Sequence, residues 1–181
     1  MEYLSLYLFV AVCLLLMLGY PVALTLAGTA LAFAVGGILG GVISDLLLRR
    51  GKSLSVARKT PIVLGLSLAT SMVLANYVDT EWLIVSIMAL AFFGKGLGAL
   101  GWAVVADTSP KQISGLSGGI FNTFGNIASI TTPIVIGYII NATGSFRMAL
   151  VYVAINAAVA VFSYLVIVGP IRRIELREAD E

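Results

Sequence analysis

Long apolar runs separated by short polar segments form the pattern of hydrophobic and polar positions along this 181-residue chain. Apolar runs of about 18 or more residues recur. Such runs are typical of helices that cross a membrane, because lipid offers the backbone polar groups no partner outside the helix. The pattern therefore predicts an all-α integral membrane protein with about six transmembrane helices.

The first apolar stretch, residues 3–43, is too long to be one span. A single helix of that length would measure roughly 60 Å, about twice the thickness of the hydrocarbon core. Pro21 disfavours helix at Tyr20, so we expect a break there. This predicts two spans, residues 3–18 and 22–43, or alternatively a single span with a re-entrant or interfacial start. Four further spans are expected at residues 60–77, 82–105, 116–140 and 148–168.

The composition supports a membrane protein and excludes several other classes. Hydrophobic residues make up 60% of the chain and charged residues 11%, which leaves too little polar surface for a soluble domain. The net charge of +2 is too small to indicate a nucleic-acid partner. With one cysteine and no histidine, an intrachain disulfide and a Cys/His metal site are both excluded. We therefore expect no metal, no cofactor and no nucleic acid, and the lipid bilayer as a partner.

The cations gather on one side of the predicted spans. The 44–59 loop holds five, the 106–115 loop holds Lys111, and the segment after Pro170 holds three, whereas the opposite side holds only Arg147. Lys and Arg are enriched in cytoplasmic loops, so the 44–59 loop and the C-terminus are expected to be cytoplasmic. The five cations of the loop are Arg49, Arg50, Lys52, Arg58 and Lys59.

The start of this basic loop, "GGVISDLLLRRG", contains paired glycines, an acidic residue and paired arginines, and cations alone would suffice to set the orientation. Asp45 can accept charge-assisted hydrogen bonds from an arginine, and Arg49 and Arg50 follow it closely. We interpret Asp45, Arg49 and Arg50 as a gating latch at a helix end, which opens and closes as helix bundles rock. The alternative is that the basic loop only sets the topology.

The same motif resembles the cytoplasmic-loop signature of the major facilitator superfamily. The segments "ARKTPIVLG", "LAFFGKGLGALGWAVVADTSPKQISGLSGG" and "ALVYVAINAAVAVFSYLVIVGP" resemble the C-terminal part of anion:cation symporters, in particular the hexarate carriers for glucarate and galactarate. This resemblance covers roughly residues 37–175. It implies a C-terminal half-bundle of a secondary carrier for organic anions, in the bacterial inner membrane. Such carriers have two six-helix halves, so it also implies a second chain or a second copy that supplies the missing half.

The first 36 residues resemble a different transporter, the large permease subunit of tripartite ATP-independent periplasmic (TRAP) transporters, above all in "LGYPVALTL". The predicted organisation is therefore a TRAP-permease-like segment over residues 1–36, major-facilitator-like helices over 37–175 and a cytoplasmic tail over 176–181. Two alternatives to a carrier stay open: a non-transporting or truncated membrane subunit, and a fragment of a TRAP-type dicarboxylate permease.

Lys95 is a cation in the middle of a predicted span. Charged groups at this depth usually face a cavity or a partner helix, and an ammonium suits an anionic sugar acid. Trp102 lies seven residues later on the same helical face. We predict that both face the substrate, and the resemblance implies the same for Trp102. The alternative for Lys95 is an ion pair or a carbonyl contact inside the bundle.

Two amides on the next span, Asn122 and Asn126, lie one helical turn apart and could bind substrate hydroxyls or carboxylates. The alternative is hydrogen bonding between helices beside neighbouring glycines. The resemblance favours the substrate cavity for Asn122. No histidine, cysteine pair or intramembrane acid is left for acid–base or nucleophilic chemistry, so we expect no catalytic residue and no enzyme.

Overall fold

A computed structural model describes the backbone of residues 20–175 and the side chains from Leu26 onwards. Every element in this part of the chain is helical. The elements are α2 (Tyr20–Arg49), α3 (Leu54–Ala69), η1 (Thr70–Tyr77), α4 (Glu81–Leu97), α5 (Gly101–Thr108), η2 (Lys111–Ile113), α6 (Ser114–Thr143), α7 (Arg147–Phe162) and η3 (Ser163–Ile167). The predicted span over residues 3–18 lies outside the described residues.

Five helical stretches in the described part are long and apolar enough to cross a membrane. They are Leu26–Arg49, Leu54–Tyr77, Glu81–Thr108, Lys111–Thr143 and Arg147–Ile167. Each contains or largely overlaps one of the five spans predicted after residue 20. The prediction of an all-α membrane-spanning bundle is thus confirmed. The predicted join near residue 36 falls inside α2, which continues through it without interruption.

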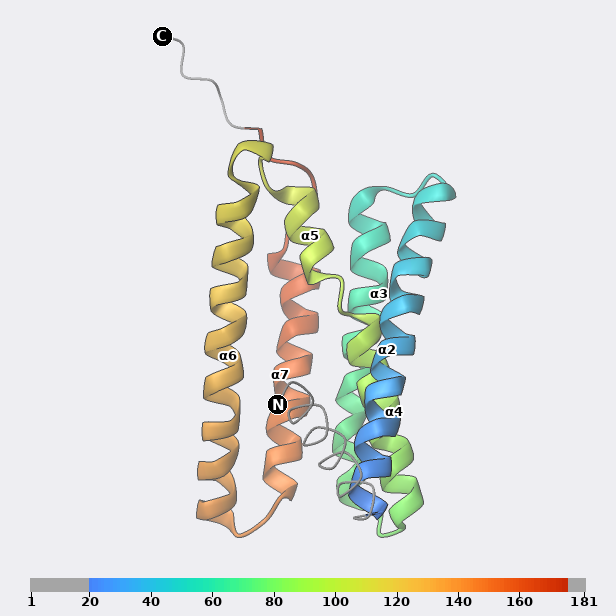
Figure 1. The fold of residues 1–181 in the computed structure, drawn as a ribbon, viewed down its shortest axis with the longest axis vertical. Helices are drawn as coiled ribbons and strands as arrows, with labels where there is room; N and C mark the ends of the chain where they lie inside the picture. Colours follow the sequence, from blue (N-terminus) through green and yellow to red (C-terminus); the bar gives the residue numbers. More distant parts are fainter. Residues whose placement is uncertain (1–19, 176–181) are drawn as a thin grey trace, which may run out of the picture.

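The helices lie side by side along one long axis (Figure 1). Helices α2, α3 and α4 pack against one another, and α7 packs against α3 and η1. Helix α6 stands at the edge of the bundle, beside α5 and α7 (Figure 1). No residue of α6 is buried. Most of the α6 surface away from α5 and α7 is therefore open in this segment, and only lipid or further protein could cover it.

Glycines allow α2 and α4 to approach until their backbones touch. A methyl group added at Gly36 would overlap the Phe93 carbonyl oxygen, and one added at Gly40 would overlap that of Leu97. By contrast, Gly41 has open space around its Cβ position. Small residues at helix contacts are typical of membrane bundles, where dispersion forces between close backbones replace the hydrophobic effect. Gly40 therefore permits a close approach of the two helices, whereas Gly41 makes no such approach in this segment.

The predicted span over residues 82–105 is two helices and not one. Helix α4 ends at Leu97, and α5 begins at Gly101. At Gly98 and Leu100 the backbone ψ angles are 2° and 10°, which lie outside the helical range. Residues 94–101 contain four glycines, each of which costs roughly 1 kcal/mol in a helix relative to alanine. This glycine density explains why the helix breaks inside the apolar run.

The basic loop is much shorter than the predicted 44–59 segment. Helix α2 continues to Arg49 and α3 begins at Leu54, so the connection itself covers only residues 50–53. Gly51 closes α2 with a φ of 75°, and the Gly51 and Lys52 N–H groups donate to carbonyls of the last turn. Arg58 and Lys59 therefore lie on α3. The prediction was wrong because hydropathy marks where apolar sequence ends, whereas a helix can continue into the polar interface.

The two ends of the bundle differ in charge. The α2–α3 connection, the α5–α6 connection and the segment after α7 all lie at one end (Figure 1). These segments and the helix ends beside them hold most of the cations, so we call this end the basic end. At the other end, Arg147 and Asn76 exchange two hydrogen bonds: the Asn76 amide donates to the Arg147 carbonyl at 3.1 Å, and the Arg147 guanidinium donates to the Asn76 carbonyl at 2.9 Å. This reciprocal pair fixes the start of α7 against the end of η1.

Candidate functional site

The interruption between α4 and α5 places Lys95 at a distinctive point of its span. Lys95 is the third-last residue of α4, near the middle of the Glu81–Thr108 stretch, and it is exposed. No hydrogen bond or ion pair holds its ammonium within residues 20–175. Broken helices at mid-membrane depth are typical of substrate sites in secondary transporters, because they free backbone polar groups there. The predicted alternative, an ion pair inside the bundle, is not formed in this segment.

Trp102 follows the interruption, on α5, and links α5 to α6. Its ring packs edge-on against Phe121, with ring centroids 5.0 Å apart and an interplanar angle of 75°. A methyl group at Gly118 would lie 3.3 Å from the Trp102 ring, so the lack of a side chain at Gly118 leaves room for the indole. The Trp102 residue nevertheless stays 54% exposed. An indole held on one edge and open on the other can serve as a wall of a binding site.

Asn122 and Asn126 lie on α6, one turn apart and both exposed. Asn122 directly follows Phe121, the residue against which Trp102 packs. No hydrogen bond to either amide side chain is found in the described part of the chain, so the predicted interhelical hydrogen bonding is not formed there. Both amides are thus free to bind a ligand or a further helix.

The structure brings two of the four predicted substrate-site residues close to each other. Trp102 and the turn that carries Asn122 meet at the α5–α6 contact. Within the described residues, Lys95 and Asn126 form no hydrogen bond, ion pair or ring contact with this pair. The four side chains occupy three helices, α4, α5 and α6. A closed cavity around an anion would need additional helices opposite them.

The three predicted latch residues lie at the basic end, where α2 stops. Asp45 and Arg49 belong to α2, Arg50 follows it, and all three are exposed. Among the described residues, Asp45 forms no ion pair with either arginine. The side chains of all three are therefore available to groups outside this segment.

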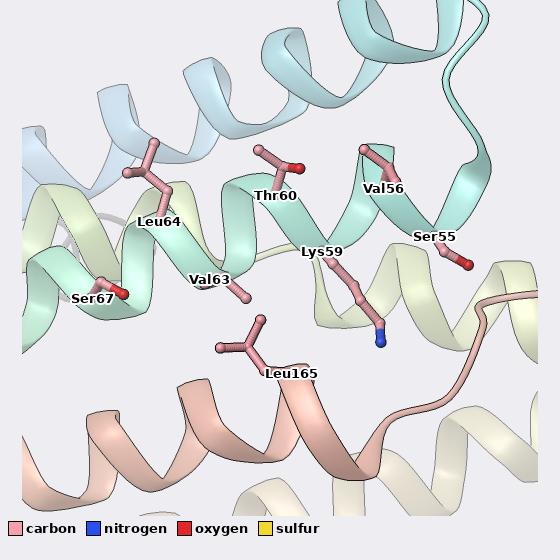
Figure 2. A pocket seen from close by; sticks show the side chains of 8 residues that line it. All are labelled: Ser55, Val56, Lys59, Thr60, Val63, Leu64, Ser67 and Leu165. Carbon is pink, nitrogen blue, oxygen red and sulfur yellow. The ribbon is translucent and has the colours of Figure 1, made fainter.

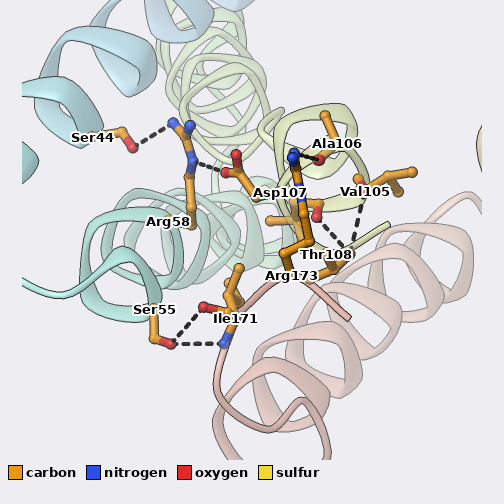
Figure 3. Close-up of polar contacts among 10 residues, drawn as sticks. Ser44, Ser55, Arg58, Val105, Ala106, Asp107, Thr108, Ile171 and Arg173 are labelled. Atoms are coloured by element: carbon orange, nitrogen blue, oxygen red, sulfur yellow. Dashed lines mark hydrogen bonds and ion pairs between the residues drawn. The ribbon is translucent and has the colours of Figure 1, made fainter. Parts of the chain in front are cut away.

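A different ion pair fixes the basic end. The Arg58 Nε donates to Asp107 Oδ2 at 2.7 Å, and the same guanidinium donates to the Ser44 hydroxyl at 2.9 Å (Figure 3). Ser44 is fully buried, and the Arg58 and Asp107 side chains are 16% and 24% exposed. This cluster connects α2, α3 and α5. Asp107 lies in the last turn of α5.

The segment after α7 runs back across the basic end and is held there by backbone hydrogen bonds. The Ile171 N–H donates to the Ser55 hydroxyl at 2.7 Å (Figure 3). The Ile174 N–H donates to the Thr108 carbonyl at 3.0 Å. The Arg173 guanidinium donates to the Ala106 carbonyl at 3.1 Å. The segment thus ties α3 to α5. Its arginines were counted for orientation, but its binding to the bundle left no sequence signal, since most of the contacts use backbone groups.

Comparison with known proteins gives several strong similarities, although no protein-family model matches the chain. A probable galactarate/D-glucarate transporter of Bacillus subtilis is 63% identical over 152 residues, which cover 84% of this chain and 33% of that protein. Two probable galactarate/D-glucarate transporters of Escherichia coli are 66% and 56% identical, over 79% and 82% of this chain and 32% and 34% of their own lengths. The chain therefore spans about a third of the length of these relatives.

These relatives are transporters and not enzymes, as the sequence predicted for this chain. The resemblance of the first 36 residues to a TRAP permease subunit gains no support from them and stays a prediction, as do the domain limits. The five membrane-spanning helical stretches and the resemblance to sugar-acid carriers agree with one another. The matched part of this integral membrane protein is similar to galactarate/D-glucarate transporters of the major facilitator superfamily over about a third of their length.

Proposed function

We propose that the chain provides the C-terminal helices of a secondary carrier for sugar diacids such as galactarate and glucarate. The observation that carries this proposal is the free ammonium of Lys95 beside the α4–α5 interruption, in a chain whose relatives are named as transporters of these dianions. A charge at this depth needs compensation by water, by a carbonyl or by an anion. A substrate carboxylate supplies that compensation, and Trp102 with the two asparagines of α6 binds the hydroxyl-bearing chain between the carboxylates.

The missing wall of this cavity comes from a second set of helices. In our proposal these helices belong to a second chain or a second copy, and they cover the open face of α5 and α6. The exposed state of α6, together with the length of the relatives, supports this arrangement. Asp45, Arg49 and Arg50 then act as the gating latch, and they form their ion pairs with the second set of helices when the cytoplasmic side closes.

We further propose that the basic end faces the cytoplasm and that the membrane is the bacterial inner membrane. Nine of the 11 cations lie in the three segments assigned to this end, and one lies at the other. This ratio is a strong bias under the rule that cytoplasmic loops are rich in Lys and Arg. The C-terminal residues 176–181 then form a cytoplasmic tail.

A chimeric carrier tests the proposal. The third of the Escherichia coli transporter that matches this chain is replaced by the corresponding residues of this chain, and uptake of labelled galactarate is measured in cells without their own sugar-acid carriers. We expect uptake by the chimera and its loss in a Lys95→Met version. Lys111→Met, which removes an exposed cation at the basic end, is the matched control and should keep uptake. A chimera that inserts into the membrane and yet transports nothing would favour a non-transporting subunit.

A further inference from the structure

A groove of about 480 Å³ runs along α3 and is bounded on its other side by η3, the continuation of α7 (Figure 2). Apart from one lysine, its walls are apolar side chains and small hydroxyl residues. They are Ser55, Val56, Lys59, Thr60, Val63, Leu64, Ser67 and Leu165. The volume is within the range of roughly 300–1,000 Å³ found for sites that hold small organic ligands. The groove therefore has room for a long apolar group.

Lys59 supplies the only charge in this groove. The Lys59 side chain extends towards the start of the segment after α7 (Figure 2), and its ammonium donates to the Val168 carbonyl. An ammonium has three donors and a full positive charge, which a carbonyl does not neutralise. Within residues 20–175, no carboxylate forms an ion pair with Lys59, whereas the charge of the adjacent Arg58 is matched by Asp107. Lys59 is thus a half-buried cation whose charge is not neutralised by a carboxylate within the described residues.

The dimensions of the groove match one leaflet of a bilayer. From Ser55 to Ser67 the axis of α3 advances by about 18 Å, and half the hydrocarbon core measures about 15 Å. The charged end lies in the second turn of α3, next to the polar α2–α3 connection, and the apolar part extends from there along the span. Lys59 therefore lies about where lipid headgroups meet the acyl chains.

We propose that this groove is a binding site for an anionic phospholipid. One acyl chain lies along Val63, Leu64 and Leu165, and the lipid phosphate accepts hydrogen bonds from the Lys59 ammonium. Charge complementarity selects this occupant over a neutral lipid, because basic pockets between membrane helices on one side of the bilayer favour acidic headgroups. The proposal is independent of the substrate site, which lies on α4, α5 and α6.

Native mass spectrometry of the detergent-purified chain tests this site, with phosphatidylglycerol or phosphatidylcholine added. We expect a preference for phosphatidylglycerol that Lys59→Met weakens by about fivefold, the typical effect of one cation near an anionic lipid surface. Lys52→Met is the matched control, since it removes the same charge from the exposed connection 50–53 and should change nothing. Leu165→Trp should fill the groove and also weaken binding, whereas Val159→Trp, at an exposed α7 position outside the groove, should not.

Four results would refute the proposed lipid site. Equal losses in Lys59→Met and Lys52→Met would mean that lipid responds only to total charge. Unchanged binding in Leu165→Trp would mean that no acyl chain occupies the groove. Displacement of the lipid by millimolar inorganic phosphate would mean that Lys59 binds free anions. Loss of the lipid in the chimeric carrier, with retention in the isolated chain, would assign the groove to another helix.

Discussion

Removal of the Asp107 charge should destabilise the basic end of the bundle by an amount set by its partial burial. Arg58 and Asp107 are 2.7 Å apart, and their side chains are 16% and 24% exposed. Fully exposed pairs contribute about 0–1 kcal/mol, whereas breaking a buried pair costs roughly 3–5 kcal/mol because one charge stays buried without a partner. For this intermediate burial we expect Asp107→Asn to cost about 2 kcal/mol.

Thermal unfolding in detergent measures this cost. For a chain of this size, 1 kcal/mol corresponds to roughly 2–4 °C, so Asp107→Asn should lower Tm by about 4–8 °C. Arg58→Met should have a similar effect. The double variant should lose clearly less than the sum of the two, since neither charge is then left alone, with a coupling of about 1–2 kcal/mol. Lys52→Met removes an exposed cation that forms no ion pair within residues 20–175, and it should leave Tm unchanged. Strict additivity of the two single variants would refute the coupling and with it our account of the basic end.

Three further predictions follow from the packing and the charge distribution. Gly36→Ala should lower the stability by about 1–3 kcal/mol through overlap with the Phe93 carbonyl, while Gly41→Ala, which meets open space, should be neutral or slightly stabilising in the same unfolding assay. Reporter fusions at Lys52 and after Glu181 should both give cytoplasmic signals, and a periplasmic signal at either position would reverse our orientation. In the chimeric carrier, Asp45→Asn should shift the balance of inward- and outward-open states and so change the accessibility of cysteines introduced in the cavity. Equal accessibility in the variant and the parent would refute the proposed latch.

The helical spans could be predicted from the sequence because each one is a long apolar run. The ends of the helices could not, since α2 and α3 continue into charged sequence at Arg49 and Arg58, where hydropathy falls although the helical hydrogen bonds persist. The break between α4 and α5 was also missed. Its glycines were visible, but they also suit close packing of an unbroken helix, and hydropathy cannot tell the two apart.

The residues of the candidate site could be proposed from the sequence, whereas their arrangement in space could not. Lys95 was recognisable from its depth in an apolar run, and the structure places it beside an interruption that strengthens the case. The contact of Trp102 with Phe121 and the ion pair of Arg58 with Asp107 join residues 19 and 49 positions apart. Such pairings depend on how the helices are arranged, and no local periodicity encodes them.

We propose that Lys95 binds the anionic substrate, and a calorimetric titration of the purified chimeric carrier with galactarate measures this binding. Loss of a hydrogen bond to a charged group costs about 1.5–3 kcal/mol, so Lys95→Met should weaken binding by about 10- to 150-fold. Lys95→Arg need not restore it, because a planar guanidinium and a compact ammonium fill space differently. Lys111→Met, with the same loss of charge, should bind as the parent does. Unchanged affinity in Lys95→Met, in a chimera that binds galactarate, would show that Lys95 does not bind the substrate and has a structural role instead.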